Sequence, residues 1–476
     1  MDKLENLRMS KNYMILMALL LLCSSSYSQS LNRNVAGTMQ VGVARVDITP
    51  TEPIRLTGYA ARGKEESTQV LSRLSAKALA FGTAKQTSLL ITVDLVGINW
   101  RITNQVVEQL SKKTGLVPAQ IAICSSHSHG SPEVGNLINI LQCRGDYPTN
   151  FSFNDSLMDL GQLIRIAQFS EQLVSKLVEV SMTALNNRKP SLVAWGQTKA
   201  SFAVNRRPQG GPVDHTLPVL RVTDPNGKVK AILVNYACHG ITLGPEVNEV
   251  HGDWMGEAQT QLEAKYPGSV AMVSVGCAGD SHPGQQGKIE YLKSHGQEIT
   301  DNVDKLLKSK LTALNTPPVG TMKWIKLPFS KIPTVTELIA LTKDKTVKGY
   351  YARLALERVI RGESLPAELD YPIQVWNFDN RMLMLNMGGE LVVDYSIRLK
   401  RELGANRLWI NAYTNDVSCY IPSRRILQEG GYEPDVSMYW YNMPSPLSEK
   451  VEDQIINTVL SLIPASFKKA GAPTKP

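Results

Sequence analysis

The sequence lacks the features that mark cysteine-rich, membrane-spanning and nucleic-acid-binding proteins. Its six cysteines are widely spaced among 476 residues, and without a C-x-x-C pair they exclude a cysteine zinc site of the usual spacing. After the N-terminal leader, no stretch is long and apolar enough to cross a membrane. The formal charge of +8 is scattered, without a basic run interleaved with aromatic residues, so we expect no nucleic-acid partner.

The N-terminus has the three-part pattern of a secretory signal peptide. Basic residues precede an apolar run at Met14–Cys23, and Ser26-Tyr27-Ser28 fits a small-x-small cleavage site. We therefore expect residues 1–28 to be a leader and the protein to be exported, either to the periplasm or outside the cell. A lipoprotein attached through Cys23 ranks second, because Leu22 stands where a small residue is wanted. Removal of the leader leaves five cysteines, an odd number, so at least one thiol is expected to be free or bridged to another chain.

Periodicity predicts one large α/β domain with a mixed central β-sheet flanked by helices. Residues 39–48 alternate apolar and polar residues as a strand does. Residues 88–95, 102–113 and 120–124 read as strand, helix and strand, which suggests a βαβ-like unit. No linker divides the chain, so we expect a linker at 29–38, one domain at 39–465 and a polar tail at 466–476. Further strands are predicted at 78–81, 192–195, 217–222, 231–238, 270–275, 382–386 and 407–411, and helices at 167–185, 256–266, 293–311 and 335–361.

Three of the seven histidines stand where predicted strands end. His127 and His129 form a His-x-His pattern, which in extended backbone would present both imidazoles on one face. Alone, that pattern is equally typical of two hydrogen-bonded polar residues at a strand end. His239 repeats the context, because it also precedes a glycine at the end of an apolar strand. Since sites collect at strand ends in α/β sheets, the repetition favours convergence at one pocket.

Three other residues carry little information when each is taken singly. Glu390 follows Gly388-Gly389 and would begin the next helix, where an acidic residue is commonly favoured by the helix dipole. Tyr420 and Tyr432 would in isolation be core or surface aromatics. Their order along the chain is more informative than their individual contexts.

The succession of these motifs resembles the catalytic domain of the neutral/alkaline non-lysosomal ceramidases. The family's T-H-T-H-S-G-P motif looks like residues 126–132, its I-N-R-S-P motif like residues 204–208, and its P-G-E motif like residues 388–390. The resemblance covers roughly residues 39–445 with the motifs in the same order. The remaining similar positions are Val41–Asp47, Gly58-Tyr59, His239-Gly240, Tyr420–Ser423 and Tyr432.

The resemblance implies a zinc hydrolase in which a metal-activated water attacks an amide or ester carbonyl. One histidine, His129, would transfer a proton or stabilise the oxyanion. Arg206 and Tyr432 would contact the substrate near the scissile group. The implied ligands of Zn²⁺ are His127, His239, Glu390 and Tyr420.

The chain departs from the family pattern in two places. The family has serine in a G-D-x-S-P turn, whereas here Ser281 falls one position early and His282 takes the serine's place. Both are candidate substrate-binding residues, but the change puts contact with a ceramide headgroup in doubt. Only 44 residues follow Tyr432, too few for the immunoglobulin-like C-terminal domain of the family's ceramidases, so approach to lipid aggregates is expected to differ.

The sequence leaves three functions open. The first is an amidase that cleaves the N-acyl bond of ceramide or a related N-acyl lipid. The second is a metallo-esterase or deacetylase on the same scaffold that acts on acylated glycans or small esters, because fold alone does not fix the substrate. The third is a non-catalytic binding protein, which the presence of every implied zinc ligand argues against.

Overall fold

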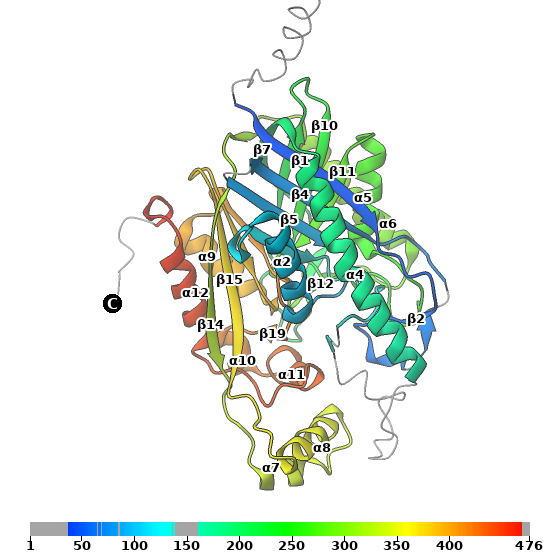
Figure 1. Cartoon of the computed structure of the whole chain (residues 1–476). Helices are drawn as coiled ribbons and strands as arrows, with labels where there is room; N and C mark the ends of the chain where they lie inside the picture. Colours follow the sequence, from blue (N-terminus) through cyan, green and yellow to red (C-terminus); the bar gives the residue numbers. More distant parts are fainter. Residues whose placement is uncertain are drawn as a thin grey trace, which may run out of the picture.

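Two β-sheets and the helices around them form the body of the molecule (Figure 1), as a computed structural model shows. The structure describes residues 37–63, 65–67, 69–83, 86–135, 137–138 and 160–468. The predicted leader, Cys23, most of the predicted linker, Cys143 and the end of the tail lie outside these residues. The fold confirms the predicted α/β class with a large mixed sheet.

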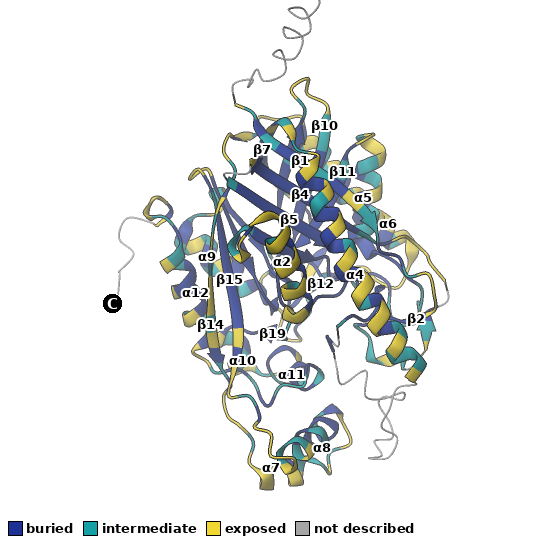
Figure 2. Ribbon diagram, viewed as in Figure 1, coloured by how far each residue is buried: buried dark blue, intermediate teal, exposed yellow. Residues whose placement is uncertain are grey.

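The larger sheet has the strand order β11-β10-β9-β7-β1-β4-β5-β6, and β13 also pairs with β7. Its strands are apolar and largely buried (Figure 2); β5, for example, buries every residue after its first. Most pairs are antiparallel, but β5–β6 and β10–β11 at the two ends are parallel. The strands are β1 (Met39–Asp47), β4 (Ser75–Thr83), β5 (Gln86–Val93), β6 (Ile121–Ser125), β7 (Lys189–Lys199), β9 (Thr216–Thr223), β10 (Val229–Tyr236), β11 (Val270–Val275) and β13 (Thr312–Leu314).

The smaller sheet has the order β14-β15-β16-β18 and packs against the larger one. Trp376 and Trp409 of this sheet share a buried cluster with Leu79 and Leu90 of the larger sheet. The strands are β14 (Val319–Pro328), β15 (Glu368–Phe378), β16 (Met382–Met387) and β18 (Leu408–Asn411). Short two-stranded ladders add β2 (Ile54–Arg55), β3 (Glu66–Ser67), β8 (Ala203–Asn205), β12 (Ser281–Pro283), β17 (Glu390–Leu391) and β19 (Tyr420–Ile421).

Helices cover the outer faces of both sheets. Helix α4 lies across β1 and β4 and packs on α2, whereas α5 packs on α6 and on β11. Helix α12 covers β14 and β15 (Figure 1). The helices are α2 (Trp100–Thr114), α4 (Leu160–Asn186), α5 (Asp253–Lys265), α6 (Ile289–Leu307), α7 (Val335–Leu341), α8 (Val347–Ile360), α9 (Val393–Leu403), α10 (Arg424–Glu429), α11 (Ser437–Trp440) and α12 (Val451–Leu462).

One arrangement occurs three times and explains where polar side chains gather. In β4-β5-α2-β6, in β9-β10-α5-β11 and in β15-β16-α9-β18, an antiparallel pair is followed by a helix and a parallel strand. The larger sheet curls, so that β6 and β11, at opposite ends of the strand order, contact each other. The carboxyl ends of the parallel strands of all three units therefore meet, as expected for a site in an α/β fold.

The predicted elements are largely confirmed, with two corrections. The helix expected at 335–361 is two helices, because α7 ends at Leu341 and Thr346 caps α8 by accepting a hydrogen bond from the Lys348 amide. The antiparallel strands β14 and β15, which α7 and α8 separate along the chain, were not predicted. Within the described residues no helix is long and apolar enough to span a membrane. The four described cysteines are free and buried.

Candidate active site

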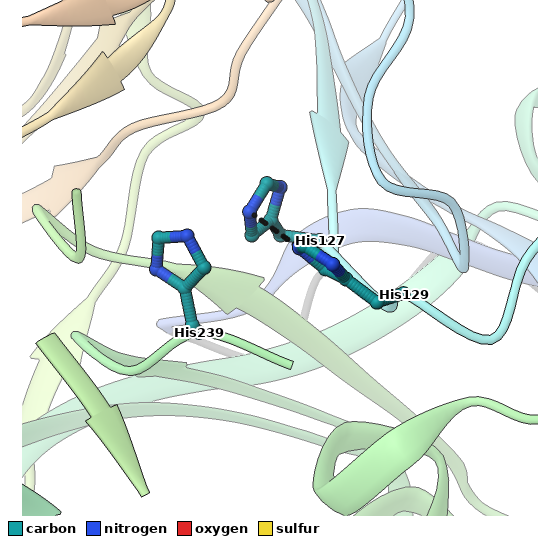
Figure 3. Close-up of side chains that lie close together, drawn as sticks. All are labelled: His127, His129 and His239. Atoms are coloured by element: carbon teal, nitrogen blue, oxygen red, sulfur yellow. Dashed lines mark hydrogen bonds between the residues drawn. The ribbon is translucent and has the colours of Figure 1, made fainter. Parts of the chain in front are cut away.

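Three buried histidines meet at the converging strand ends (Figure 3). His127 and His129 follow β6, and His239 follows β10. Their nearest ring nitrogens lie within 4.8 Å of one another. His127 Nε2 is 3.2 Å from His129 Nε2, and the rings of His127 and His239 are 4.4 Å apart between centroids. The predicted convergence of the three histidines is therefore correct.

The route by which His127 and His129 come together differs from the expected one. Strand β6 ends at Ser125, and His127 has φ = +60°, in the left-handed region that non-glycine residues rarely adopt. The loop is held by main-chain bonds from His127 N to Leu95 O and from His129 N to Gly240 O. A strained backbone held by its surroundings is a frequent property of functional sites. The expectation of an extended H-x-H was wrong.

Main-chain carbonyls fix the orientation of two imidazoles. His127 Nδ1 lies 2.7 Å from Val96 O, and His239 Nδ1 lies 2.7 Å from Ala278 O. A carbonyl oxygen can only accept, so each Nδ1 carries the proton and each Nε2 presents its lone pair to the centre of the site. Val96 follows β5 and Ala278 follows β11, so two of the three repeated units supply both histidines and their carbonyl partners.

A carboxylate and a phenol face the histidines from the other side. Glu390 and Tyr420 are register partners of the parallel pair β17–β19. Glu390 Oε2 lies 3.2 Å from the Nε2 atoms of both His127 and His239, and the Tyr420 hydroxyl lies 3.2 Å from His239 Nε2. Tyr441 donates a 2.6 Å hydrogen bond to Glu390 Oε1. Glu390 thus lies on a short strand, and the expectation that it begins a helix was wrong.

This donor set fits a metal cation. Glu390 Oε2 is buried and has no hydrogen-bond donor among the described residues, because both Nε2 atoms beside it lack a proton. A buried carboxylate oxygen without a donor is costly, and a cation shared with two imidazoles would satisfy it. Burial lowers the pKa of His239 to about 3, so its imidazole is neutral and able to coordinate at pH 7.

His129 lies beside this set with a different environment. Its Nδ1 is buried and has no partner among the described residues, and burial holds the pKa of His129 well below its usual value. Arg62 donates a 2.5 Å hydrogen bond to the His129 carbonyl, and the Tyr59 ring lies 4.8 Å from the imidazole. A Cβ on Gly58 would lie 2.3 Å from His129 Nδ1, so only glycine fits there.

Arg206 connects Tyr420 to the carboxylate of Glu433. It donates 3.0 Å hydrogen bonds to the Tyr420 hydroxyl and to Glu433 Oε1. Although burial alone would lower the pKa of Arg206, Tyr420 and Glu433 hold it well above the usual value. The guanidinium also lies 5.6 Å from the Tyr432 ring centroid, and the Tyr432 side chain is exposed at the mouth of the site. The predicted Arg206 and Tyr432 are thus beside the histidines.

The two residues of the altered turn lie further from the centre. Ser281 and His282 belong to β12, which pairs with β8. The Ser281 carbonyl accepts a hydrogen bond from His239 N, and its hydroxyl is buried. His282 is half-buried, with Gln286 Nε2 3.4 Å from its Nδ1. Neither side chain lines the two cavities described next, so the structure places Ser281 behind a histidine and His282 outside both cavities. Burial and, after it, the charge of Arg206 lower the pKa of His282.

Two cavities open on the histidines. The histidine cavity, of about 260 Å³, is lined by Gly58, Ala60, Val96, His127, His129, Ile138, Glu390, Tyr420, Tyr432, Trp440 and Tyr441. The polar cavity, of about 500 Å³, is lined by Gly58, Tyr59, His129, Arg206, Arg207, Pro208, Gln209, Ile241, Tyr420, Gly430, Gly431, Tyr432 and Glu433. They share a wall that includes His129 and the two tyrosines. One side of the centre is therefore largely apolar beyond the ligand groups, and the other carries charged groups.

Sequence reasoning missed several residues of this site. Tyr441 binds Glu390 and Arg62 holds the His129 loop, yet neither was a candidate. Tyr59 was noted only as part of a family motif. The aromatic run at 439–441 was the one signal in the sequence that could have indicated Tyr441. No pattern indicates Arg62, because its acceptors are main-chain carbonyls, one of nearby Thr57 and two on the distant segments of His129 and Val247.

Comparisons with known proteins agree with this fold and site. The structure is similar to a crystal structure of neutral ceramidase from Pseudomonas aeruginosa, with a TM-score of 0.67 and 15% sequence identity. The match covers 92% of this chain and 76% of that chain. A ceramidase complexed with C2 gives a TM-score of 0.68 and 14% identity, covering 92% of this chain and 77% of that chain. None of the curated protein sequences matches. At this identity the structures show the shared fold.

The family is shown by the sequence itself. The pattern described as "Neutral/alkaline non-lysosomal ceramidase, N-terminal" matches residues 39–302, more than half of the chain. That segment contains the three histidines and Arg206, whereas Glu390, Tyr420 and Tyr432 lie after it. The protein therefore belongs to the neutral/alkaline non-lysosomal ceramidase family and is a ceramidase-like hydrolase.

Proposed function

We propose that this protein is an exported zinc-dependent amidohydrolase that cleaves the N-acyl bond of ceramide or a related N-acyl lipid. One observation carries the proposal: Glu390 Oε2 lies buried and without a donor, 3.2 Å from two imidazole nitrogens that both lack a proton. Imidazole and carboxylate ligands suit Zn²⁺. The export part rests on the leader at 1–28.

In this proposal His127, His239, Glu390 and Tyr420 hold the metal. The fourth ligand is the phenol of Tyr420, which Arg206 positions with its 3.0 Å hydrogen bond. Bound Zn²⁺ would polarise the scissile carbonyl and lower the pKa of a water to about 7. The alternative ligand set is the three histidines alone, whose nitrogens also lie within reach of one cation.

The remaining groups handle the proton and the substrate. His129 lies 3.2 Å from His127 Nε2 without being one of the four ligands, so it would accept a proton from the attacking water and deliver it to the leaving amine. Its position is fixed by Arg62 and Gly58. Arg206, already charged and facing Tyr420, would stabilise negative charge that develops on the carbonyl oxygen. Tyr432, which is exposed and lines both cavities, would contact the substrate beside the scissile bond.

The two cavities indicate how an N-acyl lipid would lie. The acyl side would enter the histidine cavity, where Val96, Ile138 and Trp440 offer apolar contacts. The amine side would enter the polar cavity, where Arg207 and Glu433 form a 2.6 Å ion pair and Tyr59 is a wall. The carbonyl would then lie between them, beside the four ligands.

The test is hydrolysis of a labelled ceramide by the purified protein, with metal content measured alongside and a chelator control. Chelator-sensitive release of fatty acid with about one zinc per chain, as expected for a single catalytic site, supports the proposal. A Glu390→Ala variant serves as the matched inactive control. Zinc without ceramide hydrolysis would refute the ceramide assignment and retain the metal site.

A second candidate function is an esterase or deacetylase acting on acylated glycans or small esters. The size and polarity of the polar cavity favour it, because Arg206, Gln209 and Tyr432 could bind sugar hydroxyls. A panel of acetylated sugars and short esters, assayed with the same chelator control, distinguishes it. Faster turnover of these substrates than of ceramide would establish this second function.

A further inference from the structure

A groove of about 800 Å³ lies beside the histidine cavity, and we name it the tryptophan groove. Leu137, Phe329 and Leu369 line it and are buried. Trp100 and Trp324 also line it, and each is 48% exposed. Polar groups interrupt this apolar surface, because Arg101, Glu368, Asp370 and Asp416 line the groove as well. Two large exposed tryptophan side chains beside buried apolar groups are still uncommon on a solvated surface and typical of a binding site.

The groove adjoins the proposed catalytic centre through one residue. Tyr441 lines both the histidine cavity and the tryptophan groove, and its hydroxyl is fixed by the hydrogen bond to Glu390. Two consecutive residues also connect the spaces, because Leu137 lines the groove and Ile138 lines the cavity. The two spaces are therefore adjacent at the ligand wall.

The sizes of the two spaces show why they belong together. Ligand pockets commonly have volumes of about 300–1,000 Å³, and the histidine cavity, at about 260 Å³, falls below that range. It can hold the scissile group and the first carbons of an acyl chain. The tryptophan groove, at about 800 Å³, has room for the remainder.

We propose that the tryptophan groove binds the distal hydrocarbon of the substrate's acyl chain, with Tyr441 at the junction where the chain leaves the histidine cavity. This inference rests on the proposed function. It assigns selectivity for long acyl chains to Trp100, Trp324, Leu369 and Met443. Three of these four lie after residue 302, outside the segment that the family pattern matches, so the selectivity is encoded in a part of the chain that the match does not cover.

The first experiment fills the groove. Met443 is half-buried in its wall, and Met443→Trp should lower kcat/KM for N-palmitoyl sphingosine by about tenfold, the effect of displacing roughly two buried methylenes. Turnover of N-acetyl sphingosine, whose acyl group ends in the histidine cavity, should not change. Met182→Trp, at a half-buried methionine on α4 outside the groove, is the matched control. Equal effects on both substrates, or on neither, would overturn the inference.

The second experiment does not depend on turnover or on the folding of that variant. Brominated stearate bound in the groove should quench the fluorescence of Trp100 and Trp324, and the Trp100→Phe, Trp324→Phe double variant should lose most of this quenching. Trp440 lines the histidine cavity, so both proteins also carry Trp440→Phe. Trp254, Trp376 and Trp409 are fully buried and should stay unquenched in both proteins. Quenching that survives the double substitution would overturn the groove assignment. Quenching that is lost, in a protein that cleaves no N-acyl lipid, would retain the groove and refute the proposed function.

Discussion

The two sides of the proposed metal site are built differently. On the nitrogen side, formed by His127, His129 and His239, two of the three rings are oriented by main-chain carbonyls. On the oxygen side, formed by Glu390 and Tyr420, orientation comes from the side chains of Tyr441 and Arg206. A main-chain carbonyl persists through substitution, whereas a side-chain donor can be removed. The nitrogen side should therefore be the invariable part of the site and the oxygen side the adjustable part.

The largest effect is expected from removing a ligand on the nitrogen side. His127→Ala should abolish metal binding and hydrolysis, because its Nε2 lies at the centre of the cluster, 3.2 Å from both Glu390 Oε2 and His129 Nε2, and belongs to both possible ligand sets. Metal content after dialysis, measured by mass spectrometry, and ceramide hydrolysis test this expectation. Glu390→Ala should do the same from the oxygen side.

The control for both variants is His215→Ala, in the half-buried segment before β9, which should retain metal and activity. Circular dichroism establishes that each variant is folded. Full zinc content in folded His127→Ala would refute its assignment as a ligand.

His129→Ala separates the two possible ligand sets. If His127, His239, Glu390 and Tyr420 hold the metal, this variant keeps its zinc and loses about 10²–10⁴-fold in kcat, the usual contribution of a general acid–base. Unchanged turnover would contradict the assigned role. Loss of the metal together with activity would instead show that the three histidines are the ligands.

A smaller effect is expected on the oxygen side from Arg206→Lys. A single ammonium cannot reach both Tyr420 and Glu433 as the guanidinium fork does. Loss of one charged hydrogen bond costs about 1.5–3 kcal/mol, roughly a 10- to 150-fold fall in kcat/KM, with the metal retained. Steady-state kinetics on N-acetyl sphingosine measure it, and Arg424→Lys on the exposed start of α10 is the control. A rate equal to wild type would mean that Tyr420 does not need Arg206.

The sequence predicted the nitrogen side of the site better than the oxygen side. The strands that precede His127 and His239 are mostly apolar, so periodicity located both strands and the histidines that follow them. Periodicity could not show that the larger sheet curls until β6 touches β11, because that depends on long-range packing. Periodicity also could not predict the left-handed φ of His127, since the local sequence pattern fits an extended strand equally well.

The oxygen side was located by resemblance alone. Glu390 looked like a helix-initiating acid, and its pairing with Tyr420 in a two-residue ladder leaves no periodic signal. Strands β14 and β15 were missed because β14 is exposed along most of its length and its apolar residues do not alternate with polar ones. The groove depends on this strand pair, so it too could be found only in three dimensions.

The smallest expected effect concerns how the two sides are joined. Asp416, in the segment between β18 and β19 that leads to Tyr420, accepts a 2.9 Å hydrogen bond from Trp100 N at the start of α2 and another from the Ser418 hydroxyl. Burial raises the pKa of Asp416 to about 6. A carboxyl whose pKa is higher in the folded than in the unfolded state favours folding below the unfolded value, near 4, and this contribution is lost as pH rises through about 6.

Asp416→Asn removes that titration and keeps an acceptor for Trp100 N. Its free energy of unfolding, compared with wild type by urea denaturation, should rise between pH 4 and pH 8 by at most about 3 kcal/mol, the value of two pKa units. Asp301→Asn, on the exposed face of α6, controls for the loss of one negative charge. A wild-type protein that gains stability over the variant as pH rises would show that Asp416 is ionised and favourably paired in the fold. The junction between the two sides would then be an ionic contact, and loss of that contact on acidification should loosen the Tyr420 segment before it disturbs the histidines.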